Sequence, residues 1–73
     1  MTPDTLTRLG TLLFCPWGWR KHMAEWLDIN PRTVERWASG DTVIPDWLPK
    51  EMLKLARERK KELDGVVRNL EGQ

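Results

Sequence analysis

The sequence has only one cysteine and one histidine, which removes two devices that commonly stabilise small domains. Cys15 has no partner for an internal disulfide, and Cys15 and His22 are too few ligands for a structural zinc site. We therefore expect a free thiol, no metal and no cofactor. A chain of 73 residues can form one small domain with a compact core, but it is too short to enclose a deep substrate cavity as well.

The sequence also has little net charge, no long apolar run and no recognisable catalytic set. Twelve Lys and Arg residues oppose eleven Asp and Glu residues, giving a net charge of +1 and a pI of about 7.9, so bulk charge does not identify a partner. No segment approaches the roughly 20 apolar residues that cross a bilayer, and no signal-peptide pattern opens the chain. No nucleophile with a nearby base can be assembled. These absences predict a cytoplasmic protein that is not an enzyme, with neither a membrane partner nor a small-molecule substrate.

What the sequence does contain is helical periodicity, which predicts an all-α fold of four to five helices in a single domain, residues 1–73. Leucines at three- to four-residue spacing predict a first helix from Pro3 to about Phe14, with Thr2 or Asp4 as its cap. Pro16 and Gly18 then end it. The other predicted helices cover residues 19–27, residues 31–39 and, as a long amphipathic C-terminal helix capped by Asp46, residues 46–70.

The third predicted helix has unusually well-defined ends. Asn30 is a strong N-cap, Pro31 suits the first helical position, and Gly40 suits the left-handed position after the last turn. Asp28 stands where the chain must reverse, and aspartate tolerates a left-handed conformation better than most residues. Residues 19–39 therefore read as two short helices joined by a tight turn, which is the layout of a helix-turn-helix.

The outward face of this third helix carries side chains suited to reading DNA. At 100° per residue Arg32 and Arg36 lie together, with Thr33 on the flank and Ser39 nearby. Arginine donates two parallel hydrogen bonds to guanine O6 and N7, and a threonine methyl group can pack against thymine. We expect Arg32, Thr33 and Arg36 to read bases, the alternative being an ordinary solvated helix face.

A second set of residues is suited to binding phosphate. Arg20 and Lys21 lie in the first turn of the second helix, and Asn30 and Ser39 lie at the two ends of the third. Helix N-termini also favour anions. For Arg20 and Lys21, phosphate binding and a plain surface role remain open.

The segment HMAEWLDINPRTVERWASGDTVIP, together with its flanks from about Leu6 to Leu55, resembles the helix-turn-helix core of the Cro and phage repressor (XRE-like) family. It is similar in particular to small autorepressors of phages and mobile elements, a group that includes anti-CRISPR-associated regulators and some antitoxins. The resemblance implies a homodimer that binds a palindromic operator, usually in its own promoter, and places base reading on Arg32 and Arg36. Pro31 and Asp28 depart from the pattern, since Pro31 occupies a third base-reading position without a donor and Asp28 replaces the usual turn glycine.

Five tryptophans and no tyrosine form a heavy aromatic load for this length. Trp26, Trp37 and Trp47 each fall on an apolar helix face and are expected in the core. For Trp17 and Trp19, which flank a glycine between helices, packing and a stacking or partner-contact role remain open.

The C-terminal helix is too long for its whole apolar stripe to reach the core, because about 25 residues at 1.5 Å each exceed the diameter of so small a domain. We expect Leu63, Val66 and Leu70 to form a dimer contact, unless the helix breaks near Gly65 and folds back. The sequence thus predicts a repressor that binds double-stranded DNA. The alternative is a protein-interaction module, an antitoxin or adaptor, that uses this long helix.

Overall fold

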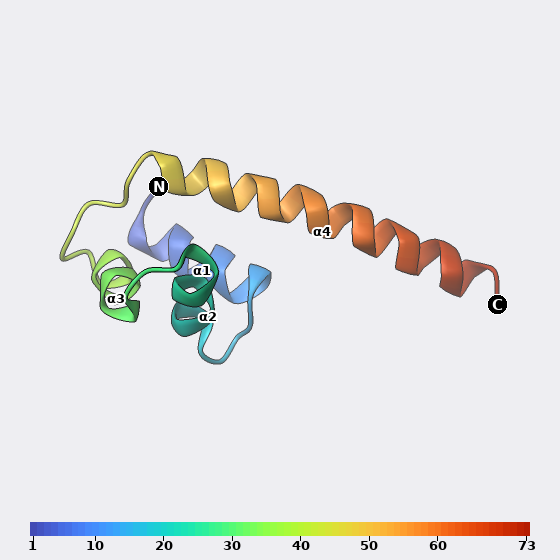
Figure 1. Ribbon diagram of the computed structural model, residues 1–73, viewed down its shortest axis with the longest axis horizontal. Helices are drawn as coiled ribbons and strands as arrows, with labels where there is room; N and C mark the ends of the chain where they lie inside the picture. Colours follow the sequence, from blue (N-terminus) through green and yellow to red (C-terminus); the bar gives the residue numbers. More distant parts are fainter.

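The computed structural model describes all residues 1–73, and its helices are joined by turns and loops without any strand. It contains α1 (Pro3–Leu13), α2 (Trp19–Leu27), α3 (Pro31–Ser39) and α4 (Trp47–Glu71). Figure 1 shows the three short helices gathered near the N-terminal half of α4, while the rest of α4 extends away from them to the C-terminus. The resulting molecule is elongated, with dimensions of 48 × 23 × 22 Å. We call α1 to α3 together with the first turns of α4 the body of the molecule.

Side-chain and backbone caps fix the ends of the short helices. The Thr2 side chain accepts a hydrogen bond from the Thr5 amide at 3.2 Å, and Asn30 Oδ1 accepts one from the Arg32 amide at 2.9 Å. Gly40 adopts the left-handed conformation, with φ of 85°, and so does Asp28, with φ of 57°. The caps predicted at Asn30 and Gly40 and the reversal at Asp28 are therefore confirmed.

Asp46 holds the N-cap position of α4, as predicted, without capping the helix through its side chain. Asp46 has a helical backbone conformation and its side chain makes no capping hydrogen bond. The chain instead enters α4 through a turn in which the Leu48 amide donates to the Pro45 carbonyl at 3.1 Å. Pro49 is tolerated because it lies in the first turn, where backbone amides have no partner within the helix.

The core is formed by eight apolar side chains contributed by all four helices. Only the first two turns of α4 take part, through Leu48 and Met52. Since α1, α2 and α3 also pack against one another, the body has a continuous core without disulfide or metal. The core residues are Leu6, Trp19, Met23, Ala24, Val34, Trp37, Leu48 and Met52.

Two of the three tryptophans predicted in the core lie at its edge. Trp37 is 5% exposed, but Trp26 is 38% and Trp47 is 47% exposed. Trp26 packs against the Phe14 ring at 5.6 Å between centroids, and Trp47 packs edge-on against Trp37 at 6.0 Å, so each covers a neighbouring aromatic ring instead of entering the core. Of the two roles left open for Trp19, the structure shows packing, because the side chain is buried beside Gly10 of α1.

The part of α4 after Arg59, which we call the free end, extends away from the body (Figure 1). The helix runs without a break through Gly65, and every residue from Lys60 to Gln73 is exposed. The predicted alternative, a break near Gly65 with the chain folding back, was therefore wrong. The apolar side chains at Leu63, Val66 and Leu70 remain uncovered in the single chain.

Candidate nucleic-acid interface

The connection between α2 and α3 holds the two helices in a fixed relation. Residues 28–30 join them, and the amides of Asp28 and Ile29 donate to the carbonyls of Glu25 and Ala24, at 3.2 and 3.0 Å. Ile29 is half-buried and packs against the core. Because Val34 and Trp37 also anchor α3 in that core, the orientation of its outward face is determined by packing.

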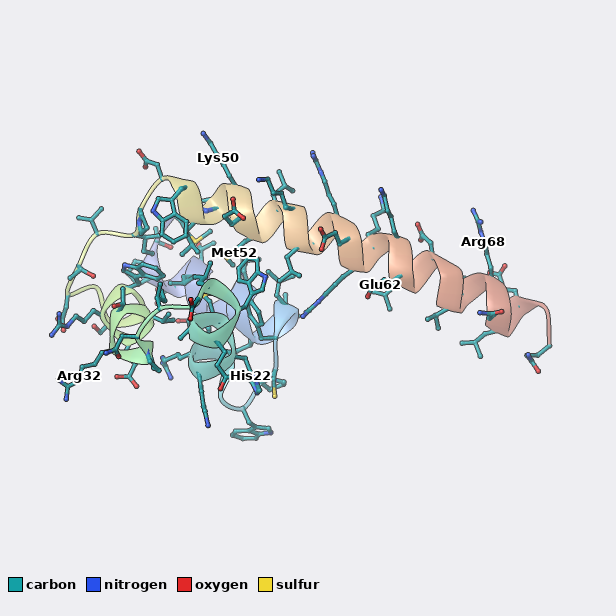
Figure 2. All side chains as sticks on the ribbon, in the orientation of Figure 1. His22, Arg32, Lys50, Met52, Glu62 and Arg68 are labelled. Carbon is teal, nitrogen blue, oxygen red and sulfur yellow. The ribbon has the colours of Figure 1, made fainter.

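The outward face of α3 presents two arginines without a salt-bridge partner. Arg32 and Arg36 are exposed and Thr33 is half-buried. The one ion pair in the molecule joins Lys54 and Glu51 at 3.3 Å, and both of these residues belong to α4, not α3. Both guanidinium groups therefore keep their N–H donors available for an external acceptor. Figure 2 shows Arg32 extending from the side of the body away from α4, whereas Lys50 extends from the outer face of α4.

The arginines share this surface with two carboxylates that the sequence analysis did not assign to the site. Glu35 and Asp41 line the same shallow depression as Arg32, Arg36 and Ser39. Helical spacing could have placed Glu35 there, since it follows Arg32 by three residues. Asp41 reaches the depression because the left-handed Gly40 turns the chain back, and its amide donates to the Arg36 carbonyl at 3.0 Å. The site is thus a mixed-charge surface of guanidinium donors and carboxylate acceptors.

Some of the residues predicted to bind phosphate already make contacts within the chain. The Arg20 guanidinium lies over the Trp19 ring, 5.2 Å from its centroid, while Lys21 is exposed and unpaired. Asn30 uses its Oδ1 as a helix cap, which leaves its amide N–H groups to donate. The Ser39 hydroxyl donates to the Arg36 carbonyl at 3.1 Å, so it would have to give up that bond to donate to a phosphate.

Other kinds of site have little support in this structure. No group of three or more His, Cys, Asp or Glu side chains could hold a metal ion. Cys15 is a half-buried free thiol. None of the helices is both long and apolar enough to cross a membrane.

Comparisons of the chain with protein-family models, curated proteins and solved structures give no match. The resemblance to phage repressors therefore depends on the residue pattern of this chain alone.

Proposed function

We propose that this protein binds double-stranded DNA sequence-specifically as a homodimer and represses transcription from its own promoter in the cytoplasm. The main support is the outward face of α3. It combines a short helix with defined ends, packed firmly on α2, with two exposed arginines that have no salt-bridge partner.

In this function α3 enters the major groove, which is wide enough to admit a helix. Arg32 and Arg36 donate paired hydrogen bonds to guanines, and Thr33 contacts a neighbouring base. Glu35, on the same surface, accepts from the N4 amino group of cytosine, which is the base-edge donor that suits a carboxylate. Asn30, Arg20 and Lys21 contact phosphates and set the register.

The charge balance favours two copies on one operator. Residues 18–44 contain four basic and four acidic side chains, so a single domain gains little from general attraction to phosphate. Two recognition helices about 34 Å apart, one turn of DNA, would instead read both halves of an inverted repeat. In this proposal Leu63, Val66 and Leu70 provide the contact between the two copies.

A fluorescence-anisotropy titration against the 100 to 200 base pairs upstream of the gene tests this function. It is run with scrambled competitor DNA at two salt concentrations. Tight binding to an inverted repeat that resists competitor supports the repressor. Weak binding that is indifferent to sequence rejects it.

Substitutions on α3 and α2 separate base reading from phosphate binding. We expect Arg32→Ala or Arg36→Ala to lose roughly 1 to 3 kcal/mol of preference for the operator over scrambled DNA. Arg20→Ala should instead weaken binding to all sequences alike and reduce the salt dependence, because a phosphate contact carries no sequence information. The measurement is the same titration with both duplexes. Equal losses on both duplexes for all three variants would contradict this division of roles.

The second candidate function is a protein-interaction module, and a specific observation favours it. The exposed apolar side chains after Arg59 form a surface of the kind that binds another protein. A chain lacking residues 62–73 that still bound a partner protein but never bound DNA would favour this function.

A further inference from the structure

An apolar groove runs between α1 and α4 on the outside of the body. Its volume is about 470 Å³, and its lining is almost wholly apolar. Two large apolar side chains of the groove are exposed to water, with Leu12 77% and Leu53 50% exposed. Such a concentration of exposed apolar surface usually marks a binding site. The side chains that form its walls include Leu9, Leu12 and Leu13 of α1 and Met52, Leu53 and Ala56 of α4.

The groove and the free end of α4 belong to one heptad pattern. Pro49, Met52 and Ala56 line the groove, and Leu63, Val66 and Leu70 follow them at the same spacing, each 14 residues further on. A strict seven-residue repeat drifts by only about 20° per heptad on a straight helix, which a left-handed supercoil absorbs. The same edge of α4 therefore lines the groove in its N-terminal half and is uncovered in its C-terminal half.

We propose that this groove is the docking site for the free end of α4 from a second copy of the chain, with the two α4 helices antiparallel. Val66 and Leu70 of each copy enter the groove of the other. The contact is self-complementary, as a two-fold dimer requires. This inference rests on the homodimer of the proposed function and specifies how that homodimer is built.

The position of the body determines the antiparallel direction. Leu48 and Met52 are buried against the other three helices. The body therefore covers the side of α4 that carries Met52, in the N-terminal half of the helix. Two α4 helices packed in parallel and in register along the heptad seam would bring both bodies into the same space. The three short helices lie beside the N-terminal half of α4 only (Figure 1). In the antiparallel arrangement the two bodies are therefore at opposite ends of the helix pair, and each lies alongside the free end of its partner.

The area that a specific dimer interface must bury also favours a contact that includes the groove. The part of α4 after Arg59 is about 18 Å long, and a contact strip about 10 Å wide on both partners covers on the order of 400 Å². Specific interfaces bury about 1,200 Å² or more. Pairing of the two free ends alone is therefore too small, and the α1 wall of the groove supplies additional apolar area. The free seam from Leu63 to Leu70 spans one heptad, the same length as the α4 wall from Pro49 to Ala56.

A second depression, beside Phe14 and Trp26, suits this occupant less well. It is bordered by His22, Glu25 and Arg59, whose charged and polar groups would lose water against a leucine or valine without gaining a partner. The Arg59 guanidinium also lies 5.5 Å from the Phe14 ring centroid, which occupies part of that surface within the single chain.

Thiol cross-linking between two forms of the full chain tests the arrangement. Both forms carry Cys15→Ser. One adds Leu12→Cys, and the other adds Leu70→Cys with a tag that separates the products by mass. We expect a short thiol cross-linker to join Leu12→Cys to Leu70→Cys at least ten times more efficiently than it joins Leu70→Cys to itself. Preferential joining of Leu70→Cys to itself would overturn the inference.

Sedimentation of a groove variant provides an independent measurement. Leu12→Asp changes a side chain that is exposed in the single chain, so the body should stay folded, as circular dichroism can verify. We expect its dimer dissociation constant to rise at least tenfold, whereas the matched control Lys61→Asp, on the opposite face of α4, should change it less than threefold. A dimer unaffected by Leu12→Asp would overturn the groove. Dimerisation through the groove without operator binding would reject the proposed function alone, and operator binding by a dimer that is insensitive to Leu12→Asp would reject this inference alone.

Discussion

At the residue scale, α1 and α2 approach each other closely at a residue that has no side chain. Gly10 of α1 faces the ring of Trp19 at the start of α2, and a Cβ atom at position 10 would overlap the ring carbons. Trp19 is 3% exposed, so its ring has no free space to move into. Gly65, the other glycine inside a helix, has nothing within 4 Å of such an atom. Packing against a neighbouring helix therefore requires glycine at position 10 but not at position 65.

This difference predicts opposite results for the same substitution. Gly10→Ala should destabilise the fold by about 1 to 3 kcal/mol, because overpacking outweighs the gain in helix propensity of about 1 kcal/mol. Gly65→Ala is the matched control and should not lower stability, because only the propensity gain applies there. Urea unfolding followed by circular dichroism measures both. An unchanged midpoint for Gly10→Ala would show that α1 and α2 do not approach this closely.

At the element scale, α3 depends on its ends more than on its length. A nine-residue helix is too short to be stable alone in water, so its caps and its two buried side chains, Val34 and Trp37, hold it in place. The same Asn30 that caps the helix is a candidate phosphate contact. In the proposed function Asn30 therefore serves both the folding of α3 and DNA binding, and suitable substitutions can separate the two.

Two substitutions at Asn30 make this separation. Asn30→Ala removes the acceptor for the Arg32 amide and should cost about 0.5 to 2 kcal/mol of stability as well as DNA affinity. Asn30→Asp keeps a capping oxygen but adds a negative charge, so stability should be retained while DNA binding weakens. Chemical unfolding and anisotropy titration measure the two effects. If Asn30→Asp bound operator as well as the original chain, Asn30 would have no phosphate contact.

At the scale of the whole molecule, the core lies entirely in the body, and the free end of α4 contributes no side chain to it. The buried side chains all lie before Arg59, and the helix continues beyond it with an exposed apolar stripe. A monomer with this shape leaves apolar surface in water without any gain for its own core. In the proposed homodimer a second copy covers that surface.

Deletion of residues 62–73 tests this separation. The shortened chain should keep its helical body and unfold cooperatively, because none of its core side chains is removed. It should also sediment as a monomer and bind the operator much more weakly, since one half-site no longer supports the other. Circular dichroism, sedimentation and anisotropy give the three readouts. A shortened chain that fails to fold would show that the free end stabilises the body, and one that remains a dimer would place the interface elsewhere.

The local structure of this protein can be predicted from the order of its residues. Spacing of apolar residues placed four helices nearly at their observed bounds, and the residue chemistry at Asn30, Asp28 and Gly40 gave the turn and the caps of α3. These features follow from interactions within a few residues, which the order of the chain specifies directly. The exposed positions of Arg32 and Arg36 followed from the same periodicity.

Contacts between residues far apart in the chain depend instead on how the four helices pack. The periodicity of α2 and α4 places Trp26 and Trp47 on apolar faces. In the folded chain these two rings pack against Phe14 and Trp37 at the edge of the core, so the two tryptophans remain partly exposed. Asp41 joins the arginines through a turn after α3. The groove between α1 and α4 combines residues about 40 positions apart in the sequence, such as Leu12 and Leu53. Burial depends on how much surface distant elements cover, and helical spacing within one segment contains no information about that coverage.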